Sequence, residues 1–206
     1  MYGPRPLPPS APFSPHARIT AEVKFAAFST MGARRGYVRD ALERDLSAQL
    51  QVALARSVRS AAYPKSGIDV FVTVLDCEGA VGAEGVGAMR ALAGAITCAS
   101  AAIADAGIEC VDVVTAGIAA EVDGVIVGDP GVGTDVGAAV VVGYMAARDE
   151  MTLVWSRGEV EGSGGLSSLV DKAVEVAIGV RGVVNESVKE RVVAALDVKQ
   201  DVAMSG

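Results

Sequence analysis

The chain has 206 residues, a net charge of −7 and an apolar half that includes few aromatic side chains. This length suits one domain with a substantial core, so we predict a single domain over residues 1–206. The only histidine is His16, which excludes a His-based catalytic triad or a His-rich metal site. No membrane segment or signal-peptide core is recognisable, and three widely spaced cysteines favour reduced, buried thiols in an intracellular protein.

The charge is distributed unevenly along the chain. Residues 1–65 hold ten basic against four acidic side chains, a net +6, whereas the remainder holds eight against 21, a net −13. A basic end on an acidic protein can attract a polyanion locally while the rest keeps the chain soluble. Nucleic acid is therefore a candidate partner. The alternative is that these basic side chains only solvate a loop and the start of a helix.

The first elements in chain order are an extended segment, a strand and a loop. Six of the eight prolines lie in residues 1–16, so residues 1–17 are expected to be an irregular lead-in. Residues 18–28 then alternate between apolar and polar side chains, with Ile19, Val23 and Phe25 on one face, which predicts a half-buried strand. Residues 29–37 are polar and contain glycine, which indicates a loop.

From Val38 the period changes to that of a helix. Apolar side chains recur every fourth residue, which predicts one long amphipathic helix ending at Tyr63-Pro64: Val38, Leu42, Leu46, Leu50, Leu54 and Val58. Arg34, Arg35 and Arg39 would lie together at its entrance. Basic residues there oppose the helix dipole, at a few tenths of a kcal/mol each, which hints at a role other than stability.

The rest of the chain alternates strands and helices. A strand over residues 68–75 precedes a glycine-rich loop at 79–87 and a buried helix at 88–106 that stops at Gly107. Further strands are predicted at 108–120, 125–127, 136–144 and 152–155, and helices at 166–181 and about 185–198. A gap at Gly182 separates the two helices, and residues 182–206 are interpreted as a C-terminal helix or tail. The order predicts an α/β or α+β fold, a mixed β-sheet packed with helices.

Two motifs could carry chemistry. Gly82, Gly85 and Gly87 precede a helix, where backbone N–H groups could bind phosphate, although the spacing fits neither a P-loop nor a dinucleotide fingerprint. Asp129 and Asp135 flank a glycine turn and could hold a divalent cation with water. The simpler readings are a flexible loop for the glycines, and a turn cap and strand flank for the two aspartates.

Several segments resemble the RNase PH-like family, whose members build the core ring of the eukaryotic RNA exosome. The resemblance rests on Tyr2-Gly3-Pro4-Arg5-Pro6, Val23-Lys24-Phe25-Ala26-Ala27-Phe28-Ser29, Glu43-Arg44-Asp45-Leu46 and Tyr63-Pro64-Lys65, and on the run 104–109 (ADAGIE) with Asp112-Val113-Val114. It is good over about residues 2–145 and only in outline beyond. It implies an RNase PH-like domain. Family members carry a strand hairpin before the Tyr-Gly-Pro segment, so an unpaired edge of the first sheet is expected.

Catalytic relatives cleave RNA from its 3′ end with phosphate. In them an arginine in a Gly-Thr-Arg turn holds the phosphate and two aspartates six residues apart support a metal. The resemblance places Leu92 at the arginine position, with Arg90 two residues away on a different face, and Asp129 and Asp135 at the aspartate positions. Because leucine makes no charge-assisted contact to phosphate, we expect no catalytic residues, no metal and no cofactor.

The resemblance also implies RNA contacts by Arg34, Arg35 and Arg39, and by Arg59 with less support. The expected function is a non-catalytic, RNA-binding ring subunit in the nucleus, nucleolus and cytoplasm. Its expected partners are other RNase PH-like ring subunits, exosome cap proteins and single-stranded RNA. Two alternatives stay open: a phosphate-dependent 3′→5′ exoribonuclease that uses Asp129 and Asp135 with magnesium, and a small-molecule α/β enzyme that uses the 79–87 glycine loop.

Overall fold

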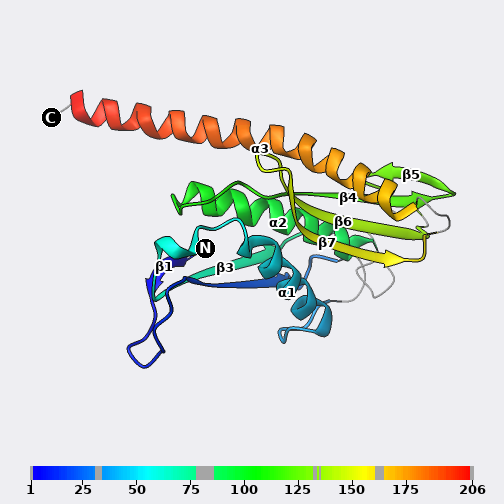
Figure 1. Cartoon of the computed structure of the whole chain (residues 1–206), viewed down its shortest axis with the longest axis horizontal. Helices are drawn as coiled ribbons and strands as arrows, with labels where there is room; N and C mark the ends of the chain where they lie inside the picture. The colour runs from blue at the N-terminus through cyan, green and yellow to red at the C-terminus, as the bar shows by residue number, and fades with distance from the viewer. Residues whose placement is uncertain are drawn as a thin grey trace.

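The computed structural model describes residues 2–30, 34–77, 86–131, 134, 136–160 and 165–204. Within these ranges the fold has four layers: a three-stranded sheet, two helices, a four-stranded sheet and a long outer helix (Figure 1). The predicted α/β class is confirmed, and the strands divide between two sheets.

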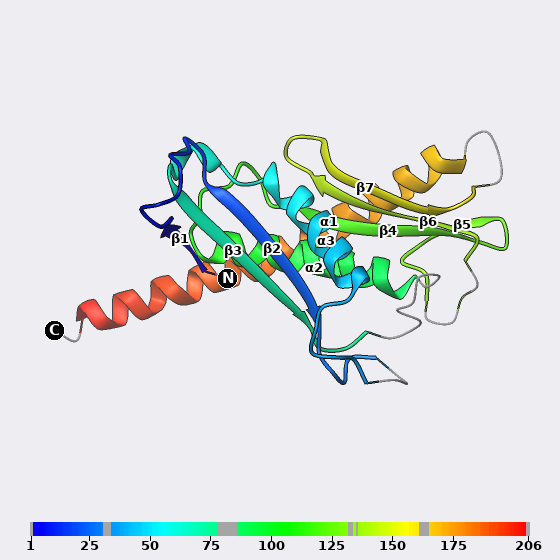
Figure 2. The same cartoon turned by 90° about the horizontal axis from the view of Figure 1, so that it is seen from below.

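The first sheet has the strand order β1-β3-β2, formed by Tyr2–Pro6, Ser66–Val74 and Arg18–Phe25 (Figure 2). β2 pairs in parallel with β3, and such a pair needs a crossover element, which α1 supplies. β1 pairs antiparallel with β3, so the predicted lead-in is extended over Tyr2–Pro6 but forms a paired strand there instead of irregular chain. Proline suits this edge strand because a ladder N–H is not required on its open side.

Helix α1 spans Ala41–Ala55 and begins at the N-cap Asp40. Leu46, Leu50 and Leu54 are fully buried, as the fourfold repeat predicted. The prediction was wrong at both ends, because Val38 is exposed before the helix and the helix stops at Ala55. Beyond it the chain turns to pair with a distant segment, with Val58 bridging to Cys110, and only the short η1 (Ser60–Ala62) is helical.

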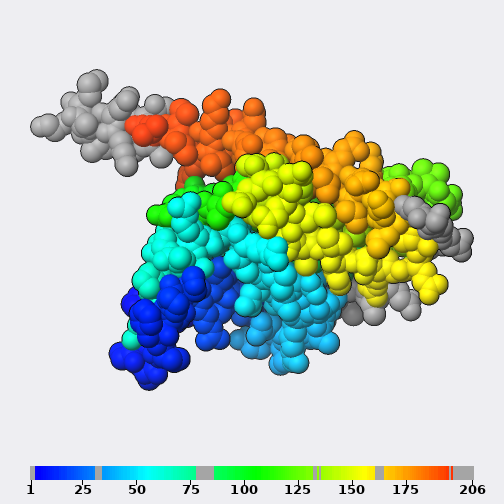
Figure 3. Space-filling model, viewed as in Figure 1, coloured from blue at the N-terminus to red at the C-terminus, as the bar shows by residue number. Residues whose placement is uncertain are grey.

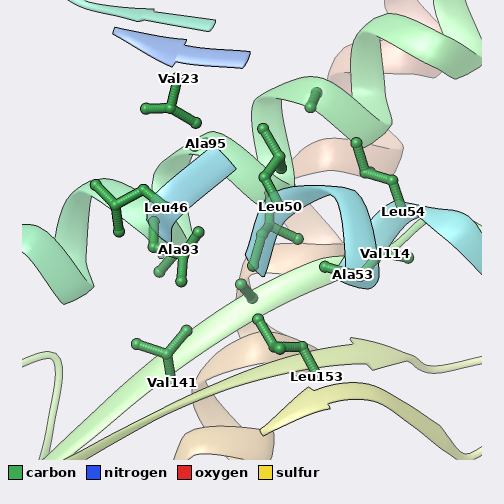
Figure 4. Close-up of a cluster of buried hydrophobic side chains, with 14 of the residues drawn as sticks. Val23, Leu46, Leu50, Ala53, Leu54, Ala93, Ala95, Val114, Val141 and Leu153 are labelled. Atoms are coloured by element: carbon green, nitrogen blue, oxygen red, sulfur yellow. The ribbon is translucent and has the colours of Figure 1, made fainter. Parts of the chain in front are cut away.

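Helix α2 spans Gly87–Asp105 and lies between α1 and the second sheet. Its buried side alternates small residues such as Ala95 and Ala99 with the large apolar side chains of Leu92 and Ile96, which fill the core between the layers. Figure 4 shows side chains from β2, α1 and the second sheet meeting in this core. By length and composition α2 would also suit a membrane, but 56% of its apolar window is buried, as in the core helix of a globular protein.

The second sheet is antiparallel with the order β5-β4-β6-β7, over Val125–Gly128, Thr115–Val122, Ala138–Met145 and Glu150–Gly158. The predicted strand 108–120 was wrong in its first half, since β4 begins at Thr115. The reason is Asp112, whose carboxylate accepts hydrogen bonds from the backbone N–H groups of Val113 and Ala147 and holds the chain in a turn.

Helix α3 runs without interruption from Gly165 to Met204, so the predicted break at Gly182 was wrong. A single glycine costs a helix only about 1 kcal/mol, and the preceding Arg181 is anchored to the body through Asp112. The first half of α3 covers β4 and β6, while its second half extends past the body of the molecule (Figures 1 and 3).

Candidate functional site

The basic loop between β2 and α1 is held at both ends by its own residues. The Arg35 N–H donates to the Ala27 carbonyl at 3.2 Å, which closes the loop onto the end of β2. At the helix start, Asp40 and Glu43 form a reciprocal capping box. These two contacts fix the backbone at the ends of the segment that carries the cations. Arg34 and Arg35 lie in the loop, and Arg39 lies just before the N-cap Asp40.

The three arginines of this loop have different surroundings. The Arg35 guanidinium lies 4.6 Å from the centre of the Phe25 ring and donates to the Asp40 carboxylate at 2.7 Å, with its side chain only 16% exposed. Arg39 lies 3.5 Å from the Glu22 carboxylate. Arg34 is exposed and, within the part of the chain that the structure describes, has no carboxylate partner. Arg34 is therefore the most available cation of the three, whereas Arg35 also stabilises the fold.

Arg59 lies apart from these residues. It follows α1 and approaches Glu109 at 3.9 Å, and its neighbour Ser60 accepts a hydrogen bond from the backbone of Ala17, just before β2 begins. The basic loop instead follows the last residue of β2. Because a strand rises about 3.3 Å per residue, eight residues separate the two positions by more than 20 Å. The structure brings Arg34, Arg35 and Arg39 together but not Arg59.

A cavity of about 710 Å³ opens at the end of the molecule where the basic loop lies. Its walls are mostly apolar and come from β3, α2, β4 and α3, and its polar side chains include Arg90, Asp76 and Asp129. Arg90 Nε lies 3.9 Å from Asp129 Oδ1. The spacing in the sequence placed Arg90 on a different helix face from Leu92, and the helix turns it toward this carboxylate.

The predicted aspartate pair can be followed only in part. Asp129 is well exposed, has a positive φ of 51° and donates its N–H to the Ile118 carbonyl at 2.9 Å. Asp135 lies outside the described residues, as do Gly82 and Gly85 of the glycine loop, while Gly87 begins α2. Among the described residues no three His, Cys, Asp or Glu side chains gather as a metal site would require. These residues alone do not make a magnesium site, so we derive no chemical step through a metal.

Leu92 lies fully buried in the core. It occupies a face of α2 different from that of Arg90, as the helical spacing predicted. No cation therefore enters the cavity from position 92, and the guanidinium nearest Asp129 belongs to Arg90 instead.

Cys77 links the cavity to the basic loop. Its N–H donates to the Ser29 carbonyl of the loop at 2.8 Å, its thiol donates to the Gly87 carbonyl at 3.4 Å, and the residue lines the cavity. Burial raises the pKa of the Cys77 thiol, while the charges of Arg90 and Arg35 act in the opposite direction. The expectation of buried thiols holds for Cys77 but is wrong for Cys98, which is exposed on α2.

Comparisons with known proteins identify the family of the chain. Residues 1–109 match the family described as 3′ exoribonuclease family, domain 1. The exosome complex component MTR3 of Chaetomium thermophilum is 39% identical over 207 residues, which cover 93% of this chain and 72% of the relative. The mtr3 component of Schizosaccharomyces pombe is 36% identical over 193 residues, covering 91% and 71%.

Less similar proteins also include exosome components. The exosome complex component Rrp41 of Pyrobaculum calidifontis is 32% identical over 165 residues, covering 76% of this chain and 63% of that protein. Among solved structures, rice Rrp46 superposes with a TM-score of 0.69 at 16% identity, covering 91% of this chain and 81% of the other. At that identity the structural similarity establishes the fold.

Proposed function

Since the chain belongs to the RNase PH-like 3′ exoribonuclease family, we propose that it is a non-catalytic, RNA-binding subunit of an RNA exosome core ring. The observation that carries this proposal is the identity of 36–39% over nine-tenths of the chain to proteins named exosome complex component MTR3. These names agree with the resemblance of the run 104–109 to the mRNA transport regulator type of ring subunit. For the compartment we propose nucleus, nucleolus and cytoplasm, as the family resemblance implies.

In this proposal the basic loop guides single-stranded RNA. Arg34 contacts a phosphate directly, and Arg39 leaves the Glu22 carboxylate to bind a second phosphate. Arg35 anchors the loop through Asp40 and adds to the positive electrostatic potential around it. Each phosphate contact to a single strand adds about −0.7 to the slope of log affinity against log salt. Arg59 lies at the other end of β2 and would serve a separate stretch of RNA.

The proposed partners are other RNase PH-like ring subunits and exosome cap proteins. The second half of α3 supports an assembly because it leaves the body and exposes Val192, Val193 and Leu196. Apolar side chains gathered on one protruding helix are typical of an interaction surface.

The non-catalytic reading is supported by Leu92, a core residue that leaves the phosphate-clamp position without a cation. One observation favours the alternative of an active phosphorolytic exoribonuclease: Arg90 stands beside Asp129 at the cavity and could receive an anion there. Nothing in the described residues favours a small-molecule enzyme built on the glycine loop.

A phosphorolysis assay separates these two functions. The purified chain, alone and with its co-assembled ring proteins, is incubated with RNA, inorganic phosphate and magnesium, and nucleoside diphosphates are measured. We expect none from this chain. Release that disappears in an Asp129→Asn variant would establish the active enzyme and overturn the non-catalytic proposal.

RNA binding is tested by charge reversal at the most exposed position. Arg34→Glu should weaken binding of single-stranded RNA at least tenfold at low salt, because it replaces an attraction to phosphate by a repulsion. Arg56→Glu is the matched control, an exposed arginine at the end of α1 that pairs with Glu150. Equal affinities of both variants and the unmodified chain would show that the loop does not bind RNA.

A further inference from the structure

Two aromatic side chains flank the basic loop and are more exposed than aromatic residues usually are. Phe28 is 75% and Tyr37 is 92% exposed. Phe28 follows Ala27, whose carbonyl accepts the Arg35 N–H, and Arg34 precedes Arg35, so Phe28 and Arg34 begin and end the segment that this contact closes. Neither ring belongs to the hydrophobic core.

Tyr37 is held in place in spite of its exposure. The Lys24 ammonium on β2 lies 4.7 Å from the centre of the Tyr37 ring and also donates a hydrogen bond to the Tyr37 carbonyl. A cation over one face of an aromatic ring is attracted to its π electrons. Because the residue is 92% exposed, the opposite face of the ring is open to solvent.

An oriented ring with a free face, next to cations, suits one ligand chemistry in particular. Single-stranded nucleic acid offers flat bases that stack on aromatic rings. It also offers a phosphate on every nucleotide that pairs with Lys or Arg. An apolar protein partner would instead favour a patch with few charges at its centre. Here the Lys24 ammonium lies over the Tyr37 ring, and three arginines lie within three residues of Tyr37 along the chain: Arg34, Arg35 and Arg39.

We infer that Tyr37 and Phe28 form a base-stacking platform for single-stranded RNA, with Tyr37 as its principal ring. This inference rests on the proposed function and deepens it, since it assigns the contacts to bases as well as those to phosphate. Arg34 and Lys24 hold the adjacent phosphates. Stacking tolerates any base, so the platform binds RNA without sequence specificity.

The test uses the full chain and two fluorescent probes: a single-stranded RNA of adenosines and an abasic oligonucleotide of equal length and charge. Tyr37→Leu removes the aromatic face but keeps apolar bulk, and it should weaken binding of the adenosine RNA about tenfold or more. Binding of the abasic probe and the salt slope should not change. Tyr37→Phe keeps a ring and should retain most of the affinity.

Phe28→Leu should show a smaller loss of the same kind. Phe13→Leu is the matched control, because Phe13 is 74% exposed in the N-terminal segment, and it should have no effect. Circular dichroism checks that all variants keep the fold, as expected for exposed positions.

The outcomes separate the platform from the proposed function. If Arg34→Glu weakens RNA binding but Tyr37→Leu does not, the platform is wrong and the RNA-binding function stands. If the unmodified chain binds neither probe, both fail. If Tyr37→Leu leaves RNA affinity intact but impairs assembly with ring proteins, the rings belong to a protein interface and the inference is overturned.

Discussion

Two helix–sheet junctions hold the molecule together by different means. Where α1 meets β2, polar side chains of the helix bind the strand: Ser47 accepts the N–H of Val23 and Glu43 accepts that of Phe25, both at 2.9 Å. Where α3 meets β4, the two backbones approach directly at Gly117, and Thr115 donates to the Ala177 carbonyl at 2.9 Å.

The difference follows from the position of each strand. β2 is an edge strand, so its N–H groups on the side away from β3 need partners, and α1 supplies them from buried side chains. β4 is an inner strand, paired with β6 over Thr115–Glu121 and with β5 over Ala119–Val122, so α3 packs on its face. On the β5 side the Ala116 N–H has no strand partner and donates to Thr97 of α2. The first junction depends on hydrogen bonds between helix side chains and strand N–H groups, whereas the second depends on close packing, one ion pair and the hydrogen bond from Thr115.

The largest effect is expected from Asp112→Ala. Asp112 is buried and holds Arg181 at 2.6 Å, which fastens α3 to the start of β4. Removing the carboxylate leaves a nearly buried guanidinium without its charge partner, although it still donates to Asn185 and to the Val113 carbonyl. We expect a cost of about 3 kcal/mol in the free energy of unfolding. Urea unfolding measures this loss. The control Asp105→Ala breaks the exposed contact between α2 and Arg191 of α3 and should cost at most about 1 kcal/mol. Equal losses in the two variants would contradict the role of Asp112 as the anchor of α3.

Gly117→Ala comes next. A Cβ at this position would lie 2.0 Å from the Ala173 carbonyl oxygen and 2.7 Å from the Ala177 nitrogen. Neither atom can move without shifting α3, so overpacking should cost about 3 kcal/mol and accelerate hydrogen exchange in α3. Gly179→Ala on the same helix meets nothing within 4 Å and should be neutral or slightly stabilising. Unchanged exchange in Gly117→Ala would refute the close packing.

Glu43→Gln tests the first junction. The buried Glu43 accepts N–H groups of Phe25 and Asp40 with its two oxygens. The amide has one acceptor oxygen, so one N–H loses its partner at a cost of about 1–2 kcal/mol, seen as a lower thermal midpoint. Asp45→Asn on the exposed side of α1 should change little. If both variants unfold alike, Glu43 does not cap the edge of β2.

Acid should weaken the α3 junction in a measurable way. Burial alone raises the pKa of Asp112, but hydrogen bonds from Arg181 and from the N–H groups of Ala147 and Val113 outweigh it, so the pKa is lower than usual. A carboxyl whose pKa is depressed by folding contributes stability above about pH 4, and that stability is lost as pH falls through its folded-state pKa. Asp112→Asn should therefore show a shallower loss of stability than the unmodified chain between pH 5 and pH 2. Parallel curves would contradict this.

Elements with strong local patterns were predicted from the sequence. Alternation marked β2, and the leucine repeat marked α1, because each exposes one apolar stripe that a single layer must cover. Segments whose state depends on distant partners were not. The chain after Ala55 leaves the helix to pair with Cys110, residues before Thr115 turn because Asp112 binds Ala147, and α3 passes through Gly182 because Arg181 is anchored.

The residues of the candidate site were also predicted only in part from the sequence. Charge counting along the chain already marked the arginines of the loop, because net charge needs no knowledge of contacts. Folding decided which of them stay available: Arg35 is engaged by Asp40 and Phe25, Arg34 is not engaged in this way, and Arg90 turns toward Asp129. Residue types set what chemistry a chain can offer, whereas the availability of each group depends on neighbours that are distant in sequence, and only packing brings those together.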